Sequence, residues 1–333
     1  MNNYKINIKN KTGLIFGPVL FFYDNNGIKL NILYYKQSKL NFNQKKYYFC
    51  LKDCKMLNTR TRSLFFALFL VLVSNNVMFS QKKGRTGITA TPTSQSMKTG
   101  AFIDVNTSTY PESSYDIAQL IKDVLIKGGT ACTSANITNV TVSPKLSASN
   151  QNRTWGFFNK GTTAFPFTKG IVLSTGYARN AGNSFISGTL NNTFSTTGDA
   201  DLSTALGVAN NFNDATYIEF DFVPTANEVT FRYIFASEEY FNDYPCNFTD
   251  GFALLLKPNT PGSTYTNMAV LPGTAGPVSV TNIRPANKFS GGALSCGPLN
   301  ATYFAGYNTA GIETNFNGRT VPLTAKATVT PGQ

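Results

Sequence analysis

The clearest alternation of apolar and polar side chains lies within residues 214–256. In the stretch 217–222 every second residue is apolar or aromatic, and the residues between them are polar or acidic. The stretch 228–236 repeats this pattern with valine and aromatic residues. A period of two in β-branched and aromatic residues predicts a strand in each stretch, with one apolar face.

A four-residue segment, Pro224–Asn227, separates the two predicted strands. A connection of this length and composition is typical of a β-hairpin turn. In that hairpin Phe220 lies opposite Phe231 and Glu219 lies opposite Arg232, so one face is apolar and the other carries a charge pair. We therefore predict that these strands pair with each other.

The rest of the chain predicts a mostly β protein. One amphipathic helix is expected at about residues 111–127, because apolar residues recur there at helical spacing and Gly128 and Gly129 follow. Residues 176–213 are rich in Gly, Asn, Ser and Thr and are expected to form loops. Short runs predict further strands at 102–105, 137–142, 170–174, 251–256, 267–271, 278–283, 302–305 and 321–329. These elements favour a jelly-roll-like β-sandwich with one early α-helix.

The N-terminal part of the chain has the features of an export signal. Residues 56–80 contain Arg60 and Arg62, about ten apolar residues and a polar end, which is the pattern of a secretory signal peptide cleaved after Ser80. A membrane anchor is the alternative, although the apolar run is shorter than the ~20 residues of a membrane span. Residues 1–55 are expected to be a non-native or disordered extension.

Charge and composition exclude several functions. The net charge is +12, but residues 1–80 hold 12 of the 29 basic residues and only 2 of the 17 acidic ones. The remainder is nearly neutral, so no nucleic-acid partner is expected. The chain contains no histidine, which excludes Ser-His-Asp and Cys-His catalysis and zinc sites that use histidine.

Acidic residues are concentrated between positions 199 and 250, where Arg232 is the one basic residue. Like charges repel unless they are separated, protonated or bridged by a cation, and calcium binds oxygen ligands of this kind. Solvated carboxylates are the alternative. If a metal binds, the expected ligands are Asp199, Asp201, Glu238, Glu239 and Asp250.

The same carboxylates allow a second hypothesis, a glycan hydrolase in which Glu238 or Glu239 acts with Asp250. The two glutamates are adjacent on a strand, so their side chains are expected to point to opposite faces and not to form the pair themselves. We expect no catalytic residues. Aromatic and Asn residues at 183–193 and 303–309 could instead form a rim that binds a sugar or a protein.

Cys246 and Cys296 are expected to form a disulfide, since both lie in loop-like sequence behind an export signal. Cys132 is left without an assigned partner. The chain ends directly after a strand pattern at Gln333, and we expect the sandwich to be truncated there and the chain to be a piece of a longer protein.

Several segments together resemble the choice-of-anchor L domain family. They are GIVLSTGYARNAG, GDADLSTALG, DATYIEFDFVPTANEVTFRYIFASEEY, FTDGFALLL and NMAVLPGTAGPVSV, which lie within residues 170–280. The resemblance covers roughly residues 101–333. It implies a secreted or cell-surface domain of the Bacteroidetes, exported by a type IX route and attached to the membrane only through its signal segment or a C-terminal anchor.

Together the residues and the resemblance predict four parts: the extension 1–55, the signal peptide 56–80, a flexible leader 81–100 and the domain 101–333. The expected function is a non-catalytic binding or adhesion module, with calcium as its one candidate cofactor and a glycan or an extracellular protein as partner. The alternatives are the glycan-active hydrolase and a structural spacer without a ligand.

Overall fold

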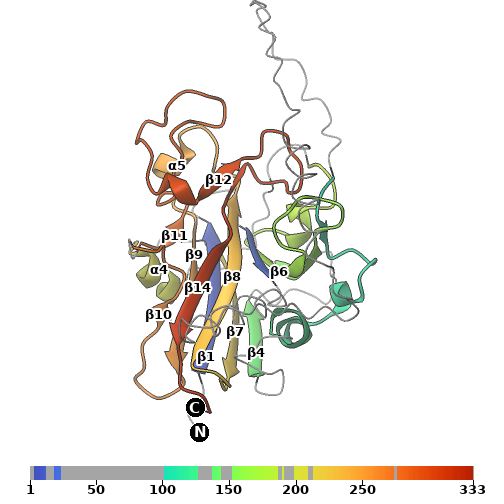
Figure 1. The fold of residues 1–333 in the computed structure, drawn as a ribbon, viewed down its shortest axis with the longest axis vertical. Coiled ribbons are helices and arrows are strands. Elements are labelled where there is room, and N and C mark those ends of the chain that lie inside the picture. Colours follow the sequence, from blue (N-terminus) through green and yellow to red (C-terminus); the bar gives the residue numbers. More distant parts are fainter. Residues whose placement is uncertain are drawn as a thin grey trace, which may run out of the picture. The chain divides into compact units, whose positions relative to one another are not determined.

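The computed structural model describes residues 4–12, 19–23, 101–126, 137–143, 152–186, 190, 199–208, 213–273 and 276–332. These residues form two antiparallel sheets, labelled in Figure 1 where there is room. Within them no helix is both long and apolar enough to cross a membrane.

The first sheet has the strand order β10-β9-β1-β7-β4, and β11 also pairs with β9. In chain order its strands are β1 (Tyr4–Thr12), β4 (Ile137–Ser143), β7 (Asn213–Phe222), β9 (Gly251–Pro258), β10 (Thr266–Asn267) and β11 (Val278–Ser279). In β9 every residue from Gly251 to Leu256 is buried. A continuous apolar run is typical of a strand covered on both faces.

The second sheet has the order β12-β13-β8-β2-β6-β5-β3, and β14 also pairs with β8. Its strands are β2 (Val19–Tyr23), β3 (Asp104–Val105), β5 (Trp155–Asn159), β6 (Lys169–Ser174), β8 (Glu228–Ser237), β12 (Phe304–Tyr307), β13 (Gly318–Thr320) and β14 (Leu323–Thr328). Figure 1 shows β14 running beside β8.

The main core lies between the two sheets and confirms the prediction of a β-sandwich. Phe220 of β7 is fully buried and Phe231 of β8 is 4% exposed, and both belong to one apolar cluster. That cluster also contains Phe252 and Leu254 of β9 and Phe157 of β5. Side chains from both inner faces therefore fill the same interior, as in other sandwiches.

The predicted hairpin between β7 and β8 is wrong. The strand β7 pairs with β1 and β4, whereas β8 pairs with β2, β13 and β14 in the other sheet. Glu219 has Asn7 and Thr141 as its strand partners, and Arg232 has Thr324. Alternation identifies the apolar face of a strand but not its neighbour, so the same two faces meet across the core and not within one sheet.

Smaller elements cover the outer faces. Phe165, Phe167 and the helical turn η5 (Ala178–Ala181) pack with Ile234 and Ala236 of β8. The helix α4 (Ala200–Leu206) was expected to be a loop, but its Leu202 and Leu206 pack against β9. The loop end above β9 carries α5 (Tyr244–Asn247) and the turn η6 (Ala301–Tyr303).

The expected early helix is present in three consecutive pieces, η2 (Pro111–Ser114), α3 (Ile117–Gln119) and η3 (Leu120–Leu125). Its main start is Asp116, which forms a capping box with Gln119. In η3 the hydrogen bonds widen to a π-helical pattern, with the N–H of Ile126 donating to the oxygen of Ile121. Gly128 and Gly129 lie outside the described residues.

Two strands, β1 and β2, come from the segment 1–55 that the sequence placed outside the domain. The strand β1 is paired on both sides, by β7 and β9, and β2 by β6 and β8. Ile6 of β1 is fully buried in the main core. Residues 24–100, which include the predicted signal peptide and leader, lie outside the described residues.

Candidate functional site

Two loops join at one end of the sandwich, where Figure 1 shows α5 and β12. The first loop follows β8 and contains α5, and the second runs from Val280 to Tyr303. A disulfide between Cys246 and Cys296 joins them, with their Cα atoms 5.7 Å apart. The two cysteines are 50 residues apart in the sequence. A disulfide that closes a loop of this length stabilises a fold by about 4 kcal/mol on the chain-entropy estimate. We refer to these two loops with β12 as the stapled end.

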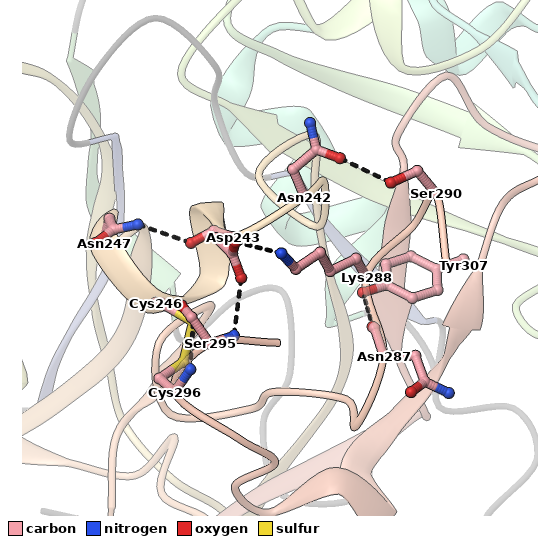
Figure 2. Close-up of polar contacts among 10 residues, drawn as sticks. All are labelled: Asn242, Asp243, Cys246, Asn247, Asn287, Lys288, Ser290, Ser295, Cys296 and Tyr307. Atoms are coloured by element: carbon pink, nitrogen blue, oxygen red, sulfur yellow. Dashed lines mark hydrogen bonds and ion pairs between the residues drawn. A yellow bond between two sulfur atoms is a disulfide. The ribbon is translucent and has the colours of Figure 1, made fainter. Parts of the chain in front are cut away.

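Asp243 holds the two loops together at a second point, as Figure 2 shows. Its carboxylate accepts hydrogen bonds from Nζ of Lys288 at 2.5 Å and from the backbone N–H of Ser295 at 2.9 Å. The bond from Lys288, followed by that from Ser295, lowers the pKa of the Asp243 carboxyl below its ordinary value. Nearby, Ser290 donates to the side-chain oxygen of Asn242 at 3.0 Å. Both loops are therefore fixed by side chains as well as by the disulfide.

A row of partly exposed aromatic rings crosses the stapled end. We call it the aromatic row, and it consists of Phe241, Tyr244, Phe248, Phe289, Phe304 and Tyr307. Its members stand 5.0–5.9 Å apart between ring centroids, the normal spacing of edge and tilted aromatic contacts. The row draws its rings from three separate segments of the chain.

Phe289 and Tyr307 are the central members of the row. The ring of Phe289 lies 5.6 Å from Phe241 and 5.4 Å from Tyr307. The hydroxyl of Tyr307 donates to the backbone oxygen of Asn287, as Figure 2 shows, and burial raises the pKa of that hydroxyl to about 12. Each ring is thus held in place while part of it remains open to solvent.

A hollow of about 230 Å³ lies beside Tyr307. Its lining includes Ile312, which is 41% exposed, and an ion pair between Arg319 and Glu313 at 3.4 Å. The hollow is smaller than the roughly 300–1,000 Å³ of a typical small-molecule pocket, so it is a minor feature of this surface.

Three of the five expected metal ligands, Glu238, Glu239 and Asp250, lie where the first loop of the stapled end leaves β8 and enters β9. Glu239 and Asp250 are fully buried and Glu238 is 6% exposed. Ser237 donates its hydroxyl to Asp250 at 3.2 Å and accepts the N–H of Glu239 at 3.0 Å. Glu238 accepts the backbone N–H of Leu190 at 3.0 Å.

Burial is the main influence on the pKa values of Glu238 and Glu239. It raises the pKa of Glu238 to about 7. The pKa of Glu239 is also raised, by burial first and then by the neighbouring charge of Asp250. Both carboxyls are therefore easier to protonate than carboxyls in water.

The other two expected ligands lie elsewhere. Asp199 is the N-cap of α4 and accepts the N–H of Leu202 at 2.9 Å, and Asp201 is an exposed residue of its first turn. Among the residues that the structure describes, no three or more His, Cys, Asp or Glu side chains are placed to hold a metal ion. The calcium site stays a prediction.

Sequence reasoning found only part of the stapled end. The expected rim at 303–309 supplies Phe304 and Tyr307 to the aromatic row, whereas Phe241 and Phe289 were not singled out. Asn183 of the other expected rim is bound to β3, where it accepts the N–H of Val105 at 2.8 Å and donates to its oxygen at 3.0 Å. The only signal for the missed rings was their closeness in sequence to the two cysteines.

Comparison with known proteins gives one match. A family model described as the choice-of-anchor L domain covers residues 105–333. No curated protein and no solved structure matches the chain.

Proposed function

Because this chain belongs to the choice-of-anchor L domain family, whose name marks a cell-surface or anchoring module, we propose that it is a non-catalytic adhesion module that binds a glycan at its stapled end. The aromatic row carries this proposal. Its six rings are each partly exposed and contact one another across three chain segments, and contiguous apolar surface open to solvent marks interaction sites on folded domains.

The chemistry of the stapled end suits a sugar. A pyranose ring has a face of C–H groups, which are slightly positive and pack on the negative faces of aromatic rings. Its hydroxyls need polar partners at the edge of that contact. Asn287 is an exposed amide beside Tyr307, and Asp243 and Lys288 are only partly covered by the protein. These groups stand close to Phe289.

The stapled end is also preorganised. The disulfide and the Lys288–Asp243 pair hold both loops before any ligand arrives. A surface that is already ordered loses less conformational entropy on binding, so a weak stacking interaction contributes more to the affinity. This supports a binding role over that of a spacer, which has no need of fixed aromatic loops.

The alternative function as a glycan hydrolase has less support. Choice-of-anchor L is not a known family of enzymes. A glycosidase needs two carboxyls flanking the bond that it cleaves, whereas Glu239 and Asp250 are fully buried. The carboxyls of Glu238, Glu239 and Asp250 are better explained as part of the protein interior next to the stapled end.

Binding can be tested with a panel of insoluble and immobilised polysaccharides. We expect Phe289→Ala and Tyr307→Ala to weaken binding about tenfold or more, the usual cost of removing a central aromatic contact. Tyr307→Phe keeps the ring and should keep most of the binding. Tyr217→Ala, which removes a partly exposed ring of β7 outside the row, is the matched control.

Melting curves of all four variants will separate lost binding from lost folding. If the two alanine variants at positions 289 and 307 fold and still bind like the wild type, the aromatic row is not the binding surface. If no polysaccharide in the panel binds the wild type, the glycan proposal fails.

A further inference from the structure

The strand β1 occupies a central place in the first sheet. It is antiparallel to β7 on one side and to β9 on the other, with Ile6 aligned with Phe220 and with Leu256. Asn7 is aligned with Glu219 and with Leu255. Ile6 is fully buried in the main core. The strand therefore completes both the hydrogen-bond ladder and the interior of the sandwich.

The two strands that pair with β1, namely β7 and β9, lie within the segment that matches the family, but β1 itself lies outside it. The match begins at residue 105, whereas β1 ends at Thr12 and β2 ends at Tyr23. The domain thus takes two central strands from a segment that its family model does not include. Residues 24–103 lie between β2 and β3.

The predicted processing site falls inside that connection. Any cut in that connection, the predicted one after Ser80 included, would leave β1 and β2 on one polypeptide and the other described strands on another. If β1 then departed, β7 and β9 would face each other with unpaired backbone N–H and C=O groups, and the place of Ile6 would be empty. Both consequences are costly, and unpaired strand edges readily accept another extended segment.

We propose that the gap between β7 and β9 is a strand-accepting site that binds the segment 4–12 when it is supplied by a separate polypeptide. The recognised chemistry is an extended segment with an apolar residue at the position of Ile6, paired through its backbone on both sides. This is strand addition, in which main-chain hydrogen bonds give affinity and alternate side chains give specificity. In a processed chain the domain is then held together without a covalent link to this strand.

Register-specific cross-linking tests this proposal. The full chain carries Glu219→Cys, with Cys50, Cys54 and Cys132 replaced by serine and a specific protease site inserted after Gly84. After cleavage, a synthetic peptide of residues 4–12 with Asn7→Cys is added in excess under mild oxidation. Since Asn7 and Glu219 are direct partners, this peptide should join to the cysteine at position 219.

A shifted peptide supplies the control. The same peptide with Lys9→Cys is aligned with Tyr217 and should cross-link about tenfold less to position 219, but efficiently to a Tyr217→Cys chain. Adding Ile6→Asp to either peptide should abolish the cross-link to its partner cysteine, because a carboxylate would enter the apolar core.

Three results would overturn the proposal. One is equal cross-linking of all the peptides to position 219, which would mean that the peptide contacts β7 without a fixed strand register. Another is the absence of a cross-link in the cleaved chain although the uncleaved chain with Asn7→Cys and Glu219→Cys forms it, which means that β1 is not accepted from outside. The third is failure of the uncleaved double variant to form the bond, which means that β1 does not lie in this place.

Discussion

Replacing Glu238 by glutamine tests whether the buried carboxyls limit stability at neutral pH. Burial raises the pKa of Glu238 to about 7, whereas a glutamate in an unfolded chain titrates near 4.3. A raised folded-state pKa means that the native protein keeps a proton that the unfolded chain has released. The stabilisation is fully present below about pH 4 and is lost as the pH rises through 7. The full loss amounts to about 4 kcal/mol.

The free energy of unfolding can be measured in guanidinium chloride at a series of pH values, with the disulfide kept oxidised. The wild-type protein should lose stability between about pH 5 and pH 8, and Glu239 should add to this loss because its pKa is raised too. Glu238→Gln does not titrate but keeps an oxygen for the N–H of Leu190. Its stability should therefore decline by about 3 kcal/mol less over the same range.

Glu228→Gln is the matched control. Glu228 lies at the start of β8 with its side chain 52% exposed, in a surface pair with Lys326 at 3.6 Å, so its removal should not change the pH profile. Parallel profiles for the wild type and Glu238→Gln would refute the reasoning. So would a wild-type stability that rises from pH 5 to pH 8, since that means that the carboxyls are ionised with a compensating cation.

Two further predictions concern the disulfide and the metal. Cys296→Ser should lower the free energy of unfolding by about 4 kcal/mol, measured in denaturant under non-reducing conditions. A loss below about 1 kcal/mol would mean that the Asp243 contacts alone fix the two loops. If calcium binds Glu238, Glu239 and Asp250, adding it should raise the melting midpoint, more at pH 8 than at pH 5, and Glu239→Gln should abolish the shift. A midpoint that is the same in calcium and in chelator would exclude a calcium site at these three of the five predicted ligands.

The faces of the strands were predictable from sequence, but their neighbours were not. Alternation at Phe220 and Phe231 is a local property, and both side chains are buried as it requires. Pairing depends on strands far away in the chain, and a turn of four residues can either reverse within one sheet or cross to the other. The segment Tyr4–Thr12 also alternates, but its polar positions are Lys and Asn, so its alternation alone does not distinguish a strand from disordered sequence.

The disulfide of the stapled end was predictable from the sequence, but the aromatic row on its surface was not. Two cysteines behind an export signal suggest a disulfide, because the redox compartment limits the alternatives. Nothing local shows that Phe241 and Phe289 will stand together, since they lie on different loops. Likewise, metal ligands or solvated carboxylates were the two expectations for Glu239 and Asp250, whereas the structure buries both side chains, shortly after the end of β8 and just before the start of β9.

Tyr240 lies between the buried carboxyl of Asp250 and the aromatic row. Its side chain is fully buried, its ring lies 4.7 Å from Phe304, and its hydroxyl has a pKa raised by burial and by Tyr307 and Asp250. The backbone of Gly318 packs so closely on it that a Cβ atom there would come within 2.8 Å of the Cβ of Tyr240. Tyr240 therefore packs against both the Gly318 backbone and the ring of Phe304. Glu239 directly precedes Tyr240 in the chain, so a change of protonation at Glu239 occurs next to the residue that packs on Phe304, at the same end of the sandwich that we propose binds the glycan.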